Sequence, residues 1–262
     1  MVTLPLVGFS TVESTNGKIL VAKNLVKVYR GTSQPALDGL NISINAGEVF
    51  GLLGPNGAGK TTAISIMNTL LKPTSGSVTI CGIDVVRYPS RVKGLIGFVP
   101  QGIALYSNLT ARENLRFFGR MYGLGGKELE KGISEGIELV GLKESADQRV
   151  FTFSGGMKRR ANLAAGILHK PKLLFLDEPT VGIDPQSRNL ILERLAAMRD
   201  RTTMVYTTHY MEEAELFCSY MVIIDAGRII AEGSPGELIN GIPGCSNLEA
   251  LFITLTGKQL RD

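Results

Sequence analysis

Cysteine, histidine and tryptophan are scarce in this sequence of 262 residues, which has three cysteines, two histidines and no tryptophan. The cysteines lie far apart with no Cys-x-x-Cys spacing, which excludes a disulfide framework and a zinc ribbon and suits a reducing compartment. They are Cys81, Cys218 and Cys245. No apolar run reaches the roughly 18–20 residues that a membrane helix needs, and the N-terminus lacks the basic start of a signal peptide. We therefore expect any role at a membrane to depend on a partner.

Basic and acidic residues are nearly balanced. Lys and Arg number 28 and Asp and Glu 24, and a net charge of +4 is too small and too evenly spread to indicate nucleic-acid binding. A hydrophobic fraction of 44% excludes wholesale disorder. What is abundant is glycine, because 31 glycines make up about 12% of the chain against roughly 7% in an average protein. This excess predicts tight turns or close backbone approaches.

Strand and helix patterns alternate on both sides of a long helical stretch. Short β-branched and apolar runs predict strands over residues 19–23, 25–30, 40–44, 48–54, 77–81, 95–99, 172–176, 203–207 and 220–230. Helical patterns occupy residues 60–71, 132–140, 158–168, 186–199 and 211–217, and a capping box of Thr110 and Glu113 begins another helix. This order predicts an α/β fold with right-handed parallel crossovers and a helical segment, about 102–168, inserted into the sheet domain.

A glycine-rich loop joins the apolar strand at 48–54 to the following helix. Residues 54–61 match the pattern G-x-x-x-x-G-K-[ST]. The glycines let backbone N–H groups turn inward around phosphate oxygens, and the helix N-terminus adds its positive dipole end. Lys60 is suited to the β- and γ-phosphates and the Thr61 hydroxyl to Mg²⁺. The alternative is a strand-to-helix turn without a ligand, and the context favours a nucleotide site.

Two carboxylates, Asp177 and Glu178, end the apolar strand at 172–176. Carboxylates at the end of a buried strand are costly unless a cation or a reaction uses them. Asp177 is the expected Mg²⁺ partner opposite Thr61, and Glu178 is the expected general base that polarises an attacking water. The alternative is a solvated strand end with a turn before Pro179.

Further motifs resemble those of ABC-type ATPases and occur in that family's order. They are Tyr29 as the adenine-stacking aromatic, Gln101 as the Q-loop, 153–157 (FSGGM) as the LSGGQ signature, 182–184 as the D-loop and His209 as the switch histidine. The likeness covers about residues 18–240. The phrases TTHYMEEAE and GRIIAEGSPGEL resemble the ATP-binding subunits of exporter-type transporters for drugs, antibiotics or sodium.

The resemblance implies a fold, ligands and residue roles. The fold is a RecA-like P-loop NTPase core with an N-terminal antiparallel β subdomain and an inserted helical subdomain. The ligands are ATP and Mg²⁺. The implied catalytic residues are Lys60, Gln101, Glu178 and His209, and the implied metal ligands are Thr61, Gln101 and Asp177. The implied nucleotide contacts are Tyr29, Gly54, Asn56, Gly57, Ala58, Gly59, Lys60, Thr61, Thr62, Ser154, Gly155 and Gly156.

The resemblance also implies partners. Two copies pair head-to-tail, so that each ATP lies between the phosphate loop of one subunit and Ser154, Gly155 and Gly156 of the other. Transmembrane permease subunits, separate from this chain, are driven from the cytoplasmic face of the membrane. The signature departs from the family pattern at Phe153 and Met157, and Met157 lacks the hydrogen-bonding amide of the family's glutamine.

The ends of the chain lie outside the ATPase domain. Residues 1–17 are read as a loose lead-in, and residues 241–262 as a helical tail. In the tail, Leu248, Leu251, Phe252 and Leu255 follow helical spacing behind a Ser246–Glu249 capping box, which predicts a helix packed on the sheet domain.

Basic and apolar side chains in the helical segment leave alternatives open. Residues 158–160 (KRR) are read as a solvated helix face, and His169 as a helix C-terminal residue. The loop at 102–109 is unusually apolar, so it either packs under the helical segment or forms a docking groove for a short helix of the membrane subunit. Arg112, Arg116 and Arg120 repeat along the following helix and either border that groove, face lipid headgroups or form a solvated face.

Three classes of function compete for this ATPase head. A transport subunit is the leading interpretation. A nucleic-acid maintenance ATPase usually carries long coiled-coil insertions, which the short segment at 102–157 does not contain. A nucleotide switch without hydrolysis is disfavoured by Glu178 and His209.

Overall fold

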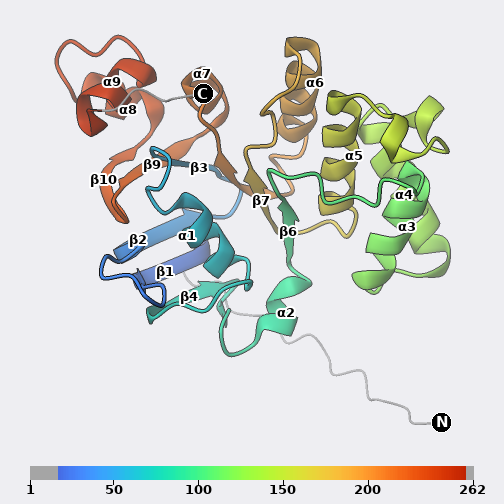
Figure 1. Ribbon diagram of the computed structural model, residues 1–262, viewed down its shortest axis with the longest axis horizontal. Coiled ribbons are helices and arrows are strands. Elements are labelled where there is room, and N and C mark those ends of the chain that lie inside the picture. Colours follow the sequence, from blue (N-terminus) through green and yellow to red (C-terminus); the bar gives the residue numbers. More distant parts are fainter. Residues whose placement is uncertain (1–16, 258–262) are drawn as a thin grey trace.

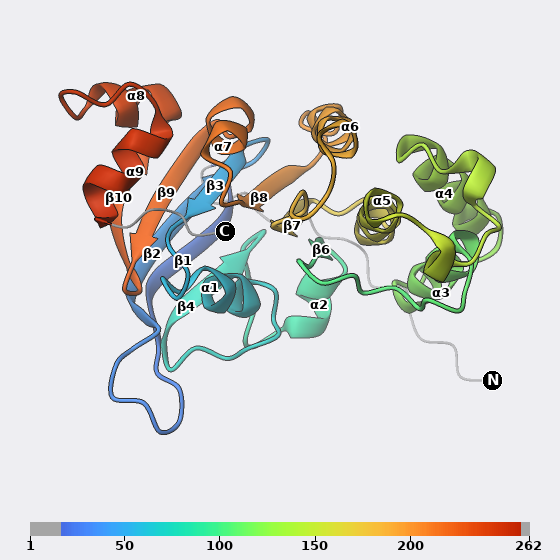
Figure 2. The ribbon, with the colours of Figure 1, turned by 45° about the horizontal axis from the view of Figure 1, so that its top comes forward.

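Two β-sheets form the framework of the part of the chain that the computed structural model describes, residues 17–257 (Figure 1). The expected lead-in at 1–17 therefore lies almost wholly outside the described residues. The helices α3, α4 and α5 lie together at one end of the molecule, and α8 and α9 lie at the opposite end, as Figures 1 and 2 both show. The arrangement is the predicted α/β fold with an antiparallel β subdomain and a helical insert.

The smaller sheet is antiparallel, with the order β2-β1-β4-β5 among the described residues. Its strands are β1 (Lys18–Lys27), β2 (Leu37–Asn45), β4 (Ser75–Ile80) and β5 (Ile83–Asp84). The prediction of two strands at 19–23 and 25–30 is wrong, because β1 is one strand that joins the first range to the start of the second and ends at Lys27. Its pairing with β2 is irregular between Ala22 and Leu25, where Asn24 has a φ of 46° and donates its N–H to Asn41 Oδ1 at 2.9 Å.

The larger sheet has the order β10-β9-β3-β8-β7-β6 in the same described part of the chain. Its strands are β3 (Val49–Leu53), β6 (Ile96–Val99), β7 (Leu173–Asp177), β8 (Thr203–Thr207), β9 (Tyr220–Asp225) and β10 (Arg228–Gly233). The strands from β9 to β6 are parallel, so their carboxyl ends share one edge. The single strand expected at 220–230 is instead the antiparallel β9–β10 hairpin, which turns at Ala226 and Gly227, both with positive φ.

Helices cover both faces of the larger sheet. Those of the core are α1 (Lys60–Met67), α2 (Pro89–Lys93), α6 (Pro185–Ala196) and α7 (Met211–Phe217). Helix α1 ends earlier than predicted, because Asn68 is its C-cap and Thr69 adopts a φ of 64°. Helix α6 begins where the Asp184 carboxylate accepts the N–H of Ser187 at 2.9 Å.

The helical insert contains α3 (Ala111–Met121), α4 (Gly126–Leu139) and α5 (Gly155–Ile167), with short 3₁₀ turns at Lys143–Ser145 and Val150–Thr152. The predicted capping box is confirmed, because the Thr110 hydroxyl accepts the N–H of Glu113 at 3.1 Å and the Glu113 carboxylate accepts the N–H of Thr110 at 2.8 Å.

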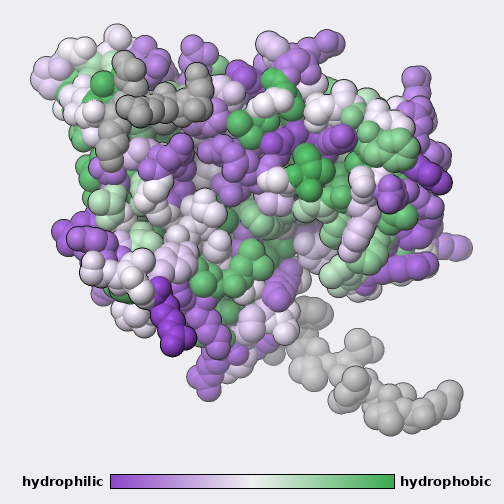
Figure 3. Space-filling view, viewed as in Figure 1, coloured by the Kyte–Doolittle hydropathy of each residue, from purple (hydrophilic) through white to green (hydrophobic). Residues whose placement is uncertain are grey.

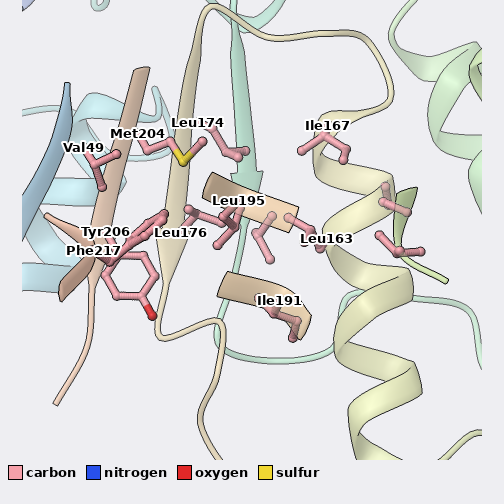
Figure 4. Packing of buried hydrophobic residues seen from close by; sticks show 14 of the residues in the cluster. Val49, Leu163, Ile167, Leu174, Leu176, Ile191, Leu195, Met204, Tyr206 and Phe217 are labelled. Carbon is pink, nitrogen blue, oxygen red and sulfur yellow. The ribbon is translucent and has the colours of Figure 1, made fainter. Parts of the chain in front are cut away.

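Two hydrophobic clusters lie on opposite faces of the larger sheet. Alternate residues of β7 supply both, with Leu174 and Leu176 in one cluster and Leu173 and Phe175 in the other. The first cluster joins the sheet to α5, α6 and α7, as the close-up in Figure 4 shows. The second joins the sheet to α1 and the antiparallel sheet. The buried strands therefore hold the carboxyl edge of the sheet rigidly between two packed layers.

The C-terminal part forms α8 (Pro235–Asn240) and α9 (Leu248–Thr256), and α9 packs against α7 and α8. Leu248, Leu251 and Phe252 are buried as expected. The predicted Ser246–Glu249 capping box is wrong, because Asn247 is the N-cap and accepts the N–H of Ala250 at 2.8 Å. Within residues 17–257, no helix is long and apolar enough to cross a membrane.

Candidate functional site

The glycine-rich loop follows β3 and leads into α1 at the carboxyl edge of the larger sheet. Gly54, Gly57 and Gly59 have φ angles of 155°, 83° and 108°. Residues that carry a Cβ rarely adopt such angles. At Gly59 a Cβ would also lie 2.5 Å from the carbonyl oxygen of Ala36. The sequence therefore needs glycine here both for backbone conformation and for the close approach of a neighbouring loop.

Lys60 is the first residue of α1 and folds back over the loop. Its Nζ donates to the carbonyl oxygens of Gly54 at 2.6 Å and Pro55 at 3.1 Å. Burial lowers the pKa of Lys60, while the nearby carboxylates of Glu178 and Asp177 act in the opposite direction. The ammonium group is thus held close to the loop by acceptors that anionic oxygens of a ligand can replace.

The neighbouring loop residues divide between the cavity and the core. Asn56, Thr61 and Thr62 line the cavity beside the loop. Ala58 is 2% exposed, and its N–H donates to the Pro55 carbonyl at 3.1 Å. The structure therefore places Ala58 as a packing residue of the loop.

Two carboxylates line the same cavity, near the Lys60 ammonium group. Asp177 ends β7, and burial raises its pKa, while a hydrogen bond from the Thr207 hydroxyl at 2.8 Å acts against this rise. Glu178 has a φ of 47°, which is uncommon for a residue with a side chain. Its N–H donates to the carbonyl and the hydroxyl oxygens of Thr207, at 3.1 and 3.0 Å, and these bonds hold the strained residue in place.

Three predicted residues meet at one atom, Oε2 of Glu178. Nε2 of Gln101 donates to Oε2 at 2.9 Å, and Nδ1 of His209 lies 3.3 Å from the same oxygen. Gln101 follows β6, Glu178 follows β7 and His209 follows β8. Since these strands are parallel neighbours, their carboxyl ends deliver the three side chains to one place.

The cavity that these residues surround has a volume of about 1250 Å³. It brings together most of the predicted site residues, namely Gly54, Asn56, Gly57, Gly59, Lys60, Thr61, Thr62, Gln101, Asp177, Glu178 and His209. This volume suits a small-molecule ligand. Gly257, at the end of α9, also lines it, and no sequence signal indicated that contact.

Tyr29 lies beside the cavity, outside the strand in which the sequence placed it. It follows the end of β1 and is 42% exposed, so its ring is no part of the core. Its hydroxyl and the Thr62 hydroxyl are 3.2 Å apart, and Nζ of Lys27 lies 5.4 Å from the centre of its ring. An exposed ring in this position offers a face on which a base can stack.

Ser154, Gly155 and Gly156 are not among the described residues that line this cavity. Ser154 is the N-cap of α5, and its hydroxyl accepts the N–H of Met157 at 3.2 Å. The phosphate loop and the signature-like helix start of one chain are therefore separate features.

The prediction of a solvated basic face at 158–160 is wrong for two of its three residues. Arg159 donates to the backbone carbonyl of Gln101 and, at 3.3 Å, to that of Val181. Arg160 donates to the carbonyls of Val140 and Gly141, at 2.9 and 3.0 Å. Burial lowers the pKa of both arginines. Helical periodicity did not reveal these contacts, because long side chains can reach sideways to loop carbonyls.

His169 follows α5, as predicted, but it is more than a helix-end residue. Its Nε2 lies 2.8 Å from the carbonyl oxygen of Ile96, and its ring stacks on Tyr122 with 3.6 Å between the centroids. Burial lowers the pKa of His169. The residue thus joins α3 to the start of β6.

Comparisons with known proteins agree with this geometry. A family model described as "ABC transporter" matches residues 37–181. The chain is 48% identical to the linearmycin resistance ATP-binding protein LnrL of Bacillus subtilis (strain 168), over 86% of this chain and 72% of that protein. It is 41% identical to the Nod factor export ATP-binding protein I of Cupriavidus metallidurans, over 93% of this chain and 80% of that protein.

The fold is also similar to that of a solved structure. That structure is a dimeric ATP-binding cassette in a post-hydrolysis state bound to ADP and Pi, with a TM-score of 0.75 and 28% identity, covering 82% of this chain and 98% of that one. The relatives favour transport over nucleic-acid maintenance or a switch without hydrolysis. The chain belongs to the ABC transporter family and is one of its ATP-binding, ATP-hydrolysing subunits, which power transport.

Proposed function

We propose that the cavity beside the glycine-rich loop binds ATP and that Glu178 is the general base for its hydrolysis. The convergence of Gln101 and His209 on Oε2 of Glu178 carries this proposal, because it fixes a carboxylate in the cavity that Lys60 also lines. A fixed carboxylate next to a phosphate site is the arrangement that activates water for attack.

Each of the other residues has a defined task in this proposal. Lys60 moves from the carbonyls of Gly54 and Pro55 to the phosphate oxygens, and its charge stabilises the negative charge of the transition state. Gln101 and His209 hold the Glu178 carboxylate and set its orientation. Tyr29 stacks on the adenine ring at the edge of the cavity.

The chemistry of the donor set fits Mg²⁺. The Thr61 hydroxyl, the Asp177 carboxylate and the amide oxygen of Gln101 are hard oxygen donors at the cavity wall. Residues 17–257 contain no group of three or more His, Cys, Asp or Glu that could hold a metal by themselves. This suits Mg²⁺, which normally takes only one or two protein ligands together with phosphates and water. When bound, the ion neutralises charge on the phosphates.

The test is the variant Glu178→Gln, which keeps the shape of the side chain and removes its basicity. We expect ATP binding to persist and hydrolysis to slow by about 10²–10⁴-fold, which is the usual contribution of a general base. Equilibrium binding of ATP and steady-state release of phosphate measure the two effects. Glu212→Gln is a matched control, because Glu212 is exposed on α7. Unchanged hydrolysis in Glu178→Gln would contradict the proposal.

We also propose that two copies pair head-to-tail around ATP. The separation of Ser154, Gly155 and Gly156 from the cavity of their own chain supports this pairing, because these residues begin a helix whose N-terminus suits phosphate. The similar cassette bound to ADP and Pi is dimeric, which also supports it. The Glu178→Gln variant should accumulate as an ATP-bound dimer in size-exclusion chromatography.

The membrane partner that we propose is a permease subunit that docks from the cytoplasmic side. Part of the loop at 102–109 packs inward, since Leu105 lies against the core, but Ile103 and Tyr106 are 38% and 52% exposed. Beside them lies a hollow of about 440 Å³ on α3, lined by Glu113, Arg116, Phe117, Arg120 and Met121. Figure 3 shows hydrophobic and hydrophilic residues side by side over this end of the molecule. An apolar surface with a charged rim suits a short amphipathic helix.

Hydrogen bonds hold the loop at 102–109 in place, and the loop directly follows Gln101, which lines the cavity. Asn114 fixes Tyr106 by accepting its N–H at 2.8 Å and donating to its carbonyl at 3.0 Å. Asn162 accepts the N–H of Ala104 at 3.1 Å. The loop begins at Gln101, which contacts Glu178, so movement of a docked helix would reach the hydrolysis site. We propose export as the direction, in agreement with the relatives named for resistance and export.

A further inference from the structure

Glu213 is a charged residue that is buried deep in the core. It lies in the first turn of α7 and is 4% exposed, whereas its neighbour Glu212 is exposed. Burying a carboxylate is costly unless hydrogen bonds and an opposite charge compensate for the lost water. The role proposed above for the cavity residues makes no use of Glu213, so its burial calls for a separate explanation.

Four side chains compensate for the burial of this carboxylate. Oε2 of Glu213 accepts hydrogen bonds from the Tyr206 hydroxyl at 2.6 Å, the Thr180 hydroxyl at 2.8 Å and the Thr208 hydroxyl at 3.2 Å. Nε of Arg188 lies 3.3 Å from Oε1. Tyr206, Thr180 and Thr208 are all at most 2% exposed. Tyr206 also packs edge-on against Phe217 within the core, as Figure 4 shows. The buried part of the cluster is therefore a rigid network, and Arg188, whose side chain is 27% exposed, connects it to the surface.

Two of these partners flank the residues that meet at the cavity. Thr180 is two residues beyond Glu178, and Thr208 immediately precedes His209. The Thr208 hydroxyl also accepts the N–H of Tyr210 at 3.0 Å, which fixes the backbone on both sides of His209. One carboxylate thus anchors the segment after β7 and the segment after β8.

The ion pair with Arg188 adds a third connection. The guanidinium of Arg188, on α6, lies 4.1 Å from the centre of the Tyr210 ring. The Tyr210 ring in turn lies 4.2 Å from the His209 ring, centroid to centroid. Glu213 therefore restrains a side chain that packs against the residue next to His209.

We propose that Glu213 is a positioning residue that sets the distance between Glu178 and His209. It touches no substrate in this role. It acts by holding Thr180 and Thr208, and so the two backbone segments that carry the pair. The proposal rests on the function proposed above, because it assigns Glu213 to the same hydrolysis site.

The first test is Glu213→Gln, which keeps the volume of the side chain but removes its charge. We expect kcat for ATP hydrolysis to fall by about 10²-fold, the size of effect that a misplacement of about 1 Å produces. The KM for ATP should change little, because the phosphate loop is not part of the cluster. Glu212→Gln on the same helix turn is the control and should match the parent protein. An unchanged kcat in a folded Glu213→Gln protein would overturn the proposal.

A second pair of variants keeps the test decisive if Glu213→Gln unfolds the core. Thr208→Val keeps the shape of threonine but loses the hydroxyl that bonds Glu213 and Tyr210, whereas Thr208→Ser keeps it. We expect kcat to fall in the valine variant and to recover in the serine variant, with similar circular dichroism spectra. Equal kcat values in the two variants would contradict the role of this hydroxyl network.

A double-mutant cycle separates this proposal from the function on which it rests. If Glu213 acts through the pair, Glu213→Gln should reduce kcat much less in a His209→Ala background than in the parent. If the fold losses in kcat of the two single variants instead multiply in the double variant, Glu213 and His209 act independently. That result would overturn the positioning role. Full hydrolysis in Glu178→Gln would instead remove the general base, and the function proposed for the cavity would fail.

Discussion

Charged groups behave oppositely in the cavity and in the helical insert. At the cavity, burial is the largest influence, and it lowers the pKa of Lys60 and raises that of Asp177, so that it acts against the charged form of each. On the insert, Arg112 and Asp147 form an exposed pair with 2.7 Å between Nε and Oδ1. There the hydrogen bond raises the pKa of Arg112 and lowers that of Asp147, so that both charged forms are favoured.

This difference separates functional charge from structural charge. Groups at the cavity remain only partly compensated by the protein, which is the condition in which a charged ligand gains most from binding them. Pairs on the insert already satisfy each other, and Arg116 with Glu130 at 2.8 Å is a second example. Exposed pairs of this kind contribute little to stability. Arg112 and Arg116 are therefore paired within the insert, and Arg116 and Arg120 also line the hollow on α3.

The largest effect should come from removing the cation of the cavity. Lys60→Ala deletes the ammonium group that we propose contacts the phosphates, and we expect ATP turnover to fall by about 10²–10³-fold, as for other preorganised charge-stabilising groups. Thermal unfolding should show a folded protein, since the bonds that Nζ makes within residues 17–257 go to loop carbonyls. Lys93→Ala, an exposed lysine on α2, is the control. Near-normal nucleotide binding and turnover in Lys60→Ala would show that the buried charge at the cavity is no more important for function than the paired charges on the insert.

An opposite result is expected from a change on the insert. Tyr106→Asp places a charge on the exposed apolar surface, so we expect basal ATP hydrolysis by the isolated subunit to stay within about twofold while co-purification with the permease is lost. Tyr88→Asp is the matched control, because Tyr88 is 40% exposed and lies at the start of α2, outside the helical insert. A grossly unstable Tyr106→Asp protein would show that the loop belongs to the core and that the docking surface is wrongly assigned.

The smallest effect is expected at Tyr29, which is exposed but borders the cavity. Tyr29→Ala should weaken ATP binding by about 1–3 kcal/mol, the range measured for stacking of bases on aromatic rings. Tyr29→Phe loses only the contact with the Thr62 hydroxyl and should be nearly neutral. Isothermal titration compares the two variants. An equal loss in both would mean that the hydroxyl, and not the ring, carries the contact.

Local patterns were enough to predict the order of most strands and helices. Buried parallel strands are continuous apolar runs, and the turn from β3 into α1 has a specific glycine pattern. Element ends were harder to predict. The single strand β1 appeared as two, because the irregularity at Asn24 interrupts its alternation, and α9 is capped by Asn247 in place of the expected Ser246. Several side chains compete for such positions, and tertiary packing decides between them.

Contacts between distant segments could not be predicted from local patterns. The segment MEEAE of α7 carries no local signal that one of its carboxylates is buried, yet partners from β8, α6 and the segment after β7 surround Glu213. Arg159 likewise bonds carbonyls that are far from it in sequence. Periodicity reports which face of a helix is apolar, and it carries no information about which polar groups from other elements meet that face.

The two oxygens of the Glu178 carboxylate differ in their surroundings. The Gln101 amide donates to Oε2 and the His209 ring approaches the same atom, while the described residues provide no hydrogen-bond partner for Oε1. Oε2 is therefore the more engaged of the two oxygens, although a carboxylate oxygen can accept further donors. In the reaction that we propose for Glu178, Oε1 is the oxygen better placed to take the proton of an attacking water. The protein thereby makes two chemically equivalent atoms inequivalent, and in the proposed reaction this asymmetry favours one side for the entry of the nucleophile.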